Sequence, residues 1–157
     1  MQTIPAASLS DTQRLAELIG QKHDVLELMR DLARRQLELI AQNDMTKMMN
    51  VLAAKETALR RLLAIEKQLD PFRDHDPQAR LWPDPESRRR CQAVAERCEA
   101  LLAELMLIEK QSESNLRQRR DETAARLKGA ESAGEARRAY AAAPAPARSQ
   151  FDISSEA

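Results

Sequence analysis

The sequence predicts an all-α protein, an antiparallel three-helix bundle or coiled coil with one long third helix and a disordered C-terminal tail. Charged residues make up 32% of the 157-residue chain and aromatic residues only 3%, a composition typical of long helices and coiled coils. The chain has three glycines, too few for the tight turns of a sheet. Apolar residues recur at three- and four-residue spacing in long segments, as on one face of a helix.

The first helix is expected over residues 11–42. Ser10 is followed three residues later by Gln13, which is the pattern of a capping box. The apolar face that follows is interrupted only by Lys22 and Gln36. Its members are Leu15, Leu18, Ile19, Val25, Leu26, Met29, Leu32, Ala33, Leu39 and Ile40.

The second helix is expected over residues 45–69, because Asn43 and Asp44 favour caps and turns over helix interiors. So short a connection predicts that the first two helices are antiparallel neighbours. The alternative is one continuous helix that is kinked at Asn43. The apolar face of this segment comprises Met45, Met48, Met49, Leu52, Leu59, Leu62, Leu63 and Leu69, with Lys55, Glu56 and Glu66 intruding.

A loop is expected over residues 70–83, opened by Asp70 and Pro71. Proline ends a helix readily, since it lacks the backbone N–H and clashes with the preceding turn. Three larger apolar residues of this loop are expected to anchor it against the end of the bundle; they are Phe72, Leu81 and Trp82.

The third helix is expected over residues 84–128. Asp84 suits the N-cap, Pro85 the first helical position and Glu86 the positive end of the helix dipole. Gly129, just after Lys128, is suited to a left-handed C-cap. Its apolar face is continuous at first and then thins, with Leu116 as its last large member; the continuous part is Cys91, Val94, Ala95, Cys98, Leu101, Leu102, Leu105 and Ile108.

These three helices would differ in length. At about 1.5 Å per residue they measure about 48, 37 and 64 Å, so the third would extend about 15 to 25 Å past the first turn. The uncovered length coincides with the thinning of its apolar face. Residues 11–128 would therefore form the bundle domain, following a flexible N-terminus of residues 1–10, and the end of the third helix would be free to receive a partner helix.

Residues 129–157 are expected to be disordered. Alanine dominates this stretch, and its only larger apolar side chains are Tyr140, Phe151 and Ile153. Such a segment buries too little surface to offset the entropy of ordering it.

The sequence favours no enzymatic or nucleic-acid function. Lys plus Arg and Asp plus Glu both total 25, so no net field attracts nucleic acid, and aromatic residues for stacking on RNA are scarce. We find no phosphate-binding glycine loop, no nucleophile motif and no metal-ligand spacing. His75 between two aspartates suggests an acid–base group, but no nucleophile accompanies it. We expect no catalytic residue, no metal and no cofactor.

The two cysteines are expected to be small core residues. Cys91 and Cys98 lie seven apart on one helix, about 10.5 Å along its axis, which excludes a disulfide between them. No stretch approaches 18 consecutive apolar residues and the N-terminus has no leader pattern. We therefore expect a cytoplasmic protein without stable membrane insertion.

The passage 37–69 resembles the FlgN-type flagellar export chaperones. It has a leucine-rich approach, an Asn-Asp break, and then Leu-x-x-Lys-Glu-x-x-Leu-x-x-Leu from Leu52 through Leu62, with Leu63 following. Members of that family typically show a Gly-Asp break, a Lys-Glu-x-x-Leu-Leu helix, a long third helix and a flexible C-terminal part. The likeness covers residues 11–128, and this chain differs in having Asn43 where glycine is common.

The resemblance implies a non-catalytic cytoplasmic chaperone of type III flagellar export. Such a protein would bind the terminal helices of hook-filament junction proteins, keep them export-competent and deliver them to the export apparatus. In the family, client binding is associated with the C-terminal part. We therefore expect the partner site at Leu105, Ile108 and Leu116, with Tyr140, Phe151 and Ile153 closing over the client. The alternative is a structural coiled-coil scaffold or self-associating adaptor that forms a homodimer.

Overall fold

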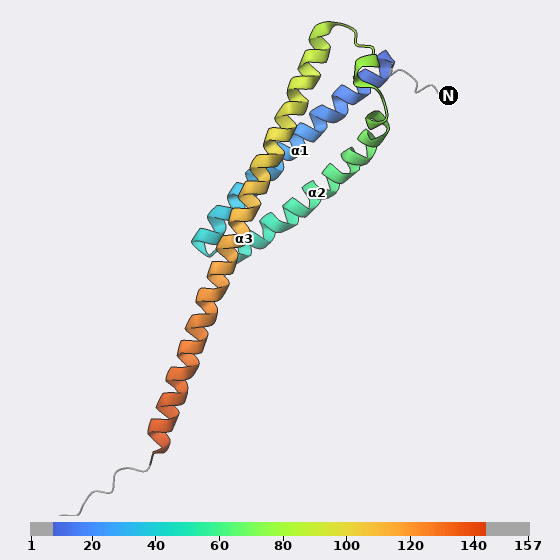
Figure 1. Cartoon of the computed structure of the whole chain (residues 1–157). Coiled ribbons are helices and arrows are strands. Elements are labelled where there is room, and N and C mark those ends of the chain that lie inside the picture. The colour runs from blue at the N-terminus through green and yellow to red at the C-terminus, as the bar shows by residue number, and fades with distance from the viewer. Residues whose placement is uncertain (1–7, 144–157) are drawn as a thin grey trace, which may run out of the picture. The chain divides into compact units, whose positions relative to one another are not determined.

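The structure, a computed structural model, describes residues 8–143 and is built from helices (Figure 1). In chain order these are α1 (Leu9–Gln42), α2 (Met45–Arg73), a short 3-10 helix η1 (Pro77–Ala79) and α3 (Pro85–Ala142). The described residues contain no strand. The predicted all-α class with a long third helix is therefore confirmed.

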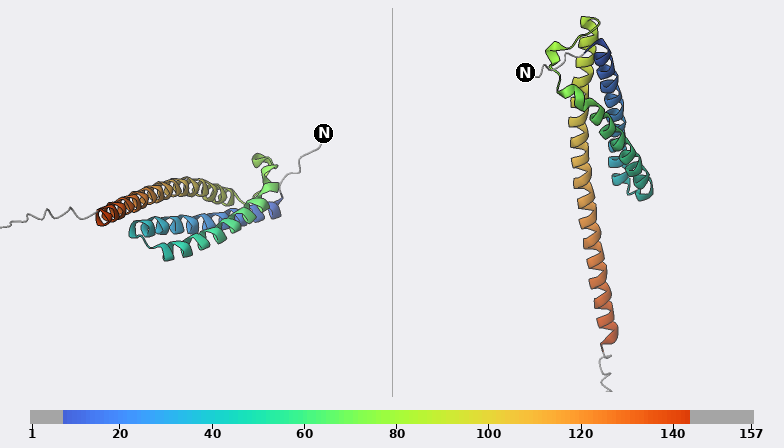
Figure 2. Two further views of the ribbon diagram at one scale, coloured as in Figure 1. Left: turned by 90° about the horizontal axis from the view of Figure 1, so that it is seen from below. Right: turned by 90° about the vertical axis from the view of Figure 1, so that its right-hand side faces the viewer.

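The chain divides at Leu116 into two units. The first unit contains α1, α2 and α3 as far as Leu116, and the second begins at Arg117 and contains the rest of α3. Within the first unit, α2 runs back along α1, and the first part of α3 runs in the direction of α1 (Figures 1 and 2). This is the expected antiparallel, up-down-up order.

The turn between α1 and α2 confirms two separate helices and excludes one kinked helix. Asn43 adopts the left-handed conformation with φ of 57°, which asparagine tolerates better than most residues. The N–H of Asn43 donates to the Ile40 carbonyl at 3.1 Å and the N–H of Asp44 to the Leu39 carbonyl at 3.0 Å. The Asp44 carboxylate then accepts the Lys47 N–H at 3.1 Å and caps α2.

The start of α1 differs from the prediction. Ser8, and not Ser10, is the N-cap: its hydroxyl accepts the Asp11 N–H at 3.2 Å, and the Asp11 carboxylate accepts the Ser8 N–H at 2.9 Å. Hydrogen bonds from the backbone and side chain of Ser8 lower the pKa of the Asp11 carboxyl. Ser8 and Asp11 therefore form a capping box in which Asp11 supplies the carboxylate. The negative charge of this carboxylate also suits the positive end of the helix dipole.

The end of α2 also differs, because the helix continues through Pro71 to Arg73. Pro71 removes one backbone hydrogen bond from the last turn. The extended helix lets Phe72 pack against the core. Trp82 also packs against the core, as expected, whereas Leu81 is 56% exposed. The loop is further tied to α1, since the Thr12 hydroxyl donates to the Leu81 carbonyl at 2.7 Å.

The start of α3 is as predicted and its end is not. The Asp84 carboxylate accepts the Ser87 N–H at 2.6 Å, and this hydrogen bond lowers the pKa of Asp84. The helix passes through Gly129, which has no positive φ, and ends at Ala142. The expected end at Lys128, and disorder beginning at residue 129, were wrong. Residues 144–157 lie outside the described residues.

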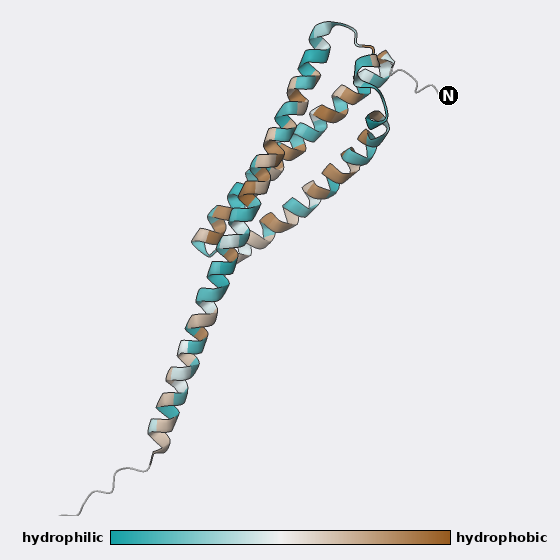
Figure 3. Cartoon of the chain, in the orientation of Figure 1, coloured by the Kyte–Doolittle hydropathy of each residue, from teal (hydrophilic) through white to brown (hydrophobic). Residues whose placement is uncertain are grey.

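The core of the first unit is an apolar cluster shared by the three helices. Leu18 and Leu26 of α1 and Leu101 of α3 are at most 1% exposed, and Ile65 of α2 is 3% exposed. A smaller cluster of Leu39, Ile40 and Met48 lies next to the α1–α2 turn. Brown, apolar residues recur along all three helices of this unit in Figure 3.

The polar residues that interrupt the apolar faces meet one another across the bundle. The Lys22 ammonium of α1 lies 2.6 Å from the Glu66 carboxylate of α2. Lys55 of α2 donates to the Gln36 side-chain carbonyl of α1 at 2.5 Å and pairs with Glu109 of α3. Gln36 is 4% exposed. Lys22, Gln36, Lys55 and Glu66 are therefore each answered by a polar group of a neighbouring helix, which fixes the register of the three helices. Glu56 differs, because it pairs with Arg60 of α2 itself.

Candidate helix-binding groove

An open groove of about 670 Å³ lies between α2 and the part of α3 in the first unit. Leu59 and Leu62 of α2 line one side, and α3 lines the other. Met29 of α1 contributes at the base, where it is 7% exposed. The residues of α3 in the lining are Leu102, Leu105, Met106, Glu109, Lys110, Ser112, Glu113 and Leu116.

The apolar rims of this groove are open to solvent. Leu59 is 44% exposed, Leu102 is 41% exposed and Met106 is 65% exposed. Large apolar side chains on both sides of a concavity form the kind of surface that accepts the apolar face of another helix. Methionine is well suited to such a surface, because its flexible side chain adapts to differently shaped partners.

One end of the groove is polar. Gln36, Lys110 and Glu113 line it together with Ser112, whose buried hydroxyl has no hydrogen-bond partner among the described residues. Beyond these residues the lining is apolar again at Leu116, which packs against the Leu39 cluster at the α1–α2 turn. A helix in the groove would thus meet an apolar stretch first and polar groups of both signs next.

The structure places two of the predicted partner-binding residues in this groove. Leu105 and Leu116 both line it, whereas Ile108 lies outside the lining and packs against the main core. Tyr140 belongs to the second unit and is 88% exposed. Phe151 and Ile153 lie outside the described residues.

None of the polar lining residues was predicted as part of the site, and five apolar ones were also missed: Met29, Leu59, Leu62, Leu102 and Met106. The sequence signal for Met106 was available. It is a large apolar residue beside the apolar face of α3 and not on it. The apolar surface of α3 is therefore wider than packing against the core requires. The leucines of α2 carried no such signal, since they occupy ordinary positions of its apolar face.

A second exposed apolar feature lies on α2. Five apolar side chains at alternating four- and three-residue spacing, a pattern that repeats every seven residues, face solvent. Glu56 occupies the one polar position in this row. Their exposed fractions are 41% for Met45, 62% for Met49, 36% for Leu52, 44% for Leu59 and 59% for Leu63. This α2 stripe has the spacing of a coiled-coil seam.

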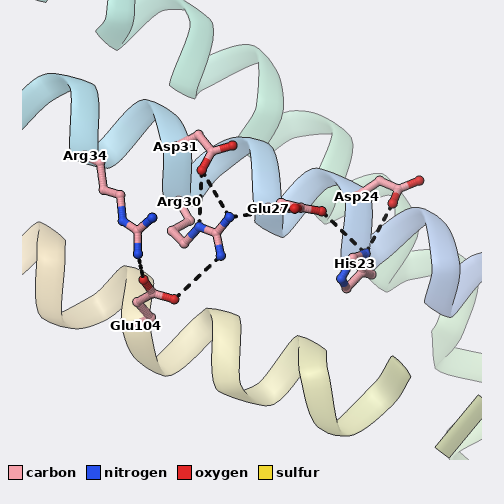
Figure 4. A network of polar contacts seen from close by, with 7 residues as sticks. All are labelled: His23, Asp24, Glu27, Arg30, Asp31, Arg34 and Glu104. Carbon is pink, nitrogen blue, oxygen red and sulfur yellow. Dashed lines mark hydrogen bonds and ion pairs between the residues drawn. The ribbon is translucent and has the colours of Figure 1, made fainter. Parts of the chain in front are cut away.

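The polar surface of α1 opposite α3 carries a network of charges (Figure 4). His23 Nδ1 lies 3.2 Å from the Asp24 carboxylate and 3.9 Å from the Glu27 carboxylate. Arg30 lies 3.7 Å from Glu27 and 3.8 Å from Glu104 of α3. The atoms of His23, Asp24 and Glu27 that could coordinate a metal ion lie within 4.8 Å of one another. Because the Arg30 guanidinium already neutralises Glu27, we assign this network to packing of α1 on α3.

The two cysteines have the environment of core residues. Both are free and buried, and the Cys98 thiol lies 3.8 Å from the Ile19 carbonyl. Burial raises the pKa of both thiols, so they stay protonated and unreactive at neutral pH.

His75 packs edge-on against Phe72, with ring centroids 5.8 Å apart.

None of the described helices is both long and apolar enough to cross a bilayer. Comparison of the chain with protein-family models, with curated proteins and with solved structures gives no match.

Proposed function

We propose that this protein is a non-catalytic cytoplasmic chaperone that binds an amphipathic helix of a client protein in the groove between α2 and α3. The observation that carries this proposal is the row of exposed apolar side chains on both rims of that groove. A partner helix would convert the three-helix unit into a four-helix arrangement and bury these side chains.

The groove offers enough apolar surface for reversible binding. Each large side chain that becomes fully buried contributes about 1.5 to 3 kcal/mol before the costs of association and ordering. Leu59, Leu102 and Met106 are already partly buried, with 41% to 65% of their surface exposed, so each would contribute only part of that amount. The sum is consistent with a client that is held during delivery and then released.

The resemblance to FlgN-type chaperones supplies the class of client. On that basis we propose that the bound segment is a terminal helix of a hook-filament junction protein, and that the complex is delivered to the flagellar export apparatus. The Lys-Glu-x-x-Leu pattern of this resemblance lies on α2, and its Lys55, Leu59 and Leu62 stand in or next to the groove.

A pair of substitutions on neighbouring residues of α3 tests the groove. Met106 lines it and is 65% exposed, whereas Leu107 does not line it and is 70% exposed. Met106→Asp should weaken binding of a fluorescently labelled terminal helix of a hook-filament junction protein by more than about tenfold, since the charge would have to be desolvated. Leu107→Asp should leave the anisotropy titration unchanged.

Both variants should keep the helical content of the parent chain, because both side chains are exposed. Equal loss of binding in the two variants would mean that the client lies elsewhere. No binding to the parent protein would remove the chaperone proposal for this client class.

The second candidate is a self-associating coiled-coil scaffold, and the α2 stripe favours it. Met49 and Leu63 are both about three-fifths exposed and point to a seam between two copies of α2. Sedimentation equilibrium separates the candidates. A dimer that Leu63→Lys dissociates supports the scaffold, whereas a monomer that binds the client helix supports the chaperone.

A further inference from the structure

A second cavity, of about 300 Å³, lies where the loop before α3 crosses α1 and the start of α3. It shares no lining residue with the groove. Leu15 and Ile19 of α1, Trp82 of the loop and Ala95 of α3 supply its apolar walls. The volume suits a small apolar group and one polar head.

The polar part of this cavity is cationic. Arg80 and Arg88 line it, and no Asp or Glu does. Among the residues that the structure describes, neither arginine forms an ion pair. The carboxylates of Asp76 and Asp84 are used as helix caps, where they accept the N–H groups of Gln78 and Ser87.

The hydrogen-bonding capacity of the two guanidinium groups is largely unused. Arg80 Nη2 donates to the Phe72 carbonyl at 2.8 Å, but its Nε is buried and has no partner within residues 8–143. In the part of the chain that the structure describes, Arg88 Nη2 donates only to the Gln78 side-chain carbonyl, at 3.1 Å. The positive charge of Arg80 also opposes the effect of burial on the pKa of the Cys91 thiol, which places that charge beside the cavity wall.

A half-buried, unpaired guanidinium next to an apolar wall is costly unless an anion accompanies it. Two guanidinium groups offer planar donor pairs that match a carboxylate better than a spherical ion. The neighbouring leucine, isoleucine and tryptophan would surround whatever carries that carboxylate.

We propose that this cavity binds a carboxylate with a short branched aliphatic body, held by Arg80 and Arg88 at its head and by Leu15, Ile19 and Trp82 around its body. Two sources share this chemistry. One is a free branched-chain carboxylic acid, and the other is the C-terminal carboxylate of a polypeptide that ends in leucine or a similar residue.

The only tryptophan of the chain lines the cavity, so its fluorescence reports occupancy directly. Isovalerate should change the Trp82 emission in a saturable way, and the neutral isovaleramide should not. A short peptide that ends in leucine is titrated both as the free acid and as the C-terminal amide. A response to isovalerate identifies a small-acid site, and a response to the peptide acid alone identifies a chain terminus.

Two arginine variants provide the matched comparison. Arg88→Gln should weaken binding of the responding acid by about tenfold or more, which corresponds to the loss of one charged hydrogen-bond pair. Arg89→Gln removes the same charge one residue away, where the guanidinium is exposed and pairs with Glu86 at 3.1 Å. It should leave the affinity within about twofold, because exposed charges are well screened.

Three results would overturn the proposal. The first is a Trp82 emission that neither acid changes. The second is an equal response to acid and amide, which would show that the arginines do not recognise the charge. The third is equal weakening by Arg88→Gln and Arg89→Gln, which would reduce the effect to net charge. The acid-against-amide titration uses the unaltered chain and so does not depend on how a variant folds.

Discussion

The two parts of α3 are helical for different reasons. From Pro85 to Leu116 the helix has a buried face, with Cys98, Leu101 and Leu105 at most 6% exposed. From Arg117 to Ala142 the same helix has no buried residue among those described. Packing of the buried face stabilises the helix in the first part, whereas intrinsic propensity and local contacts stabilise it in the second part.

The local contacts of the second part are those of an exposed helix. The Gln118 amide donates to the Glu122 carboxylate at 3.3 Å, and the Thr123 hydroxyl donates to the Arg119 carbonyl at 2.9 Å. Between residues 129 and 142, six residues are alanine, the strongest helix former. Lack of a core therefore argues against tertiary structure in this stretch, and not against a helix.

The largest difference between the two parts should come from leucine-to-alanine substitutions. Leu101 is 1% exposed and Leu127 is 61% exposed. Leu101→Ala should lower the free energy of unfolding by about 2 to 5 kcal/mol, through lost burial and a cavity. Leu127→Ala should change it by less than about 0.5 kcal/mol. Urea unfolding followed by Trp82 fluorescence measures both, and equal effects would contradict the division at Leu116.

Truncation of Lys55 should have the next largest effect. Its side chain is 14% exposed and joins Gln36 of α1 to Glu109 of α3. Lys55→Ala should cost about 1.5 to 3 kcal/mol, because a charge-assisted hydrogen bond is lost and a buried amide is left without its partner. Lys47→Ala is the control, since Lys47 is 63% exposed and its only ion pair among the described residues is with Asp44, the N-cap of α2. It should cost less than about 1 kcal/mol.

How far the sequence predicts this molecule follows from the same contrast. Periodicity locates the buried faces of α1, α2 and the first part of α3, because burial is what creates that pattern. It does not locate the end of α3. Gly129 looked like a cap, but a glycine caps a helix only where the chain turns, and the alanines beyond it keep the chain helical.

The site was harder to predict than the fold. Leu105 and Leu116 follow from the apolar face of α3, but Leu59 and Met29 enter the groove only because three helices pack at particular positions. Similarly, Lys22, Gln36, Lys55 and Glu66 were visible as interruptions of apolar faces. Their pairing depends on the relative register of the helices, which no single segment contains.

Serine-to-alanine substitutions should show a smaller effect of the opposite sign. The Ser112 hydroxyl is buried without a partner in residues 8–143, so Ser112→Ala removes an uncompensated polar group and should raise the free energy of unfolding by about 1 kcal/mol. Ser132 is exposed in the second part of α3. Ser132→Ala should leave the Trp82-detected transition unchanged. Destabilisation by Ser112→Ala would indicate that a bound water satisfies the hydroxyl.

Replacing a glycine in each part gives the smallest and most local comparison. A Cβ atom added at Gly20 or at Gly134 would meet no atom within 4 Å, so alanine should gain about 0.5 to 1 kcal/mol of helix propensity at either position. Gly20→Ala should shift the Trp82-detected unfolding transition to higher urea. Gly134→Ala should raise only the far-ultraviolet helical signal, without moving that transition. If Gly134→Ala moves it as far as Gly20→Ala does, the second part of α3 unfolds together with the bundle.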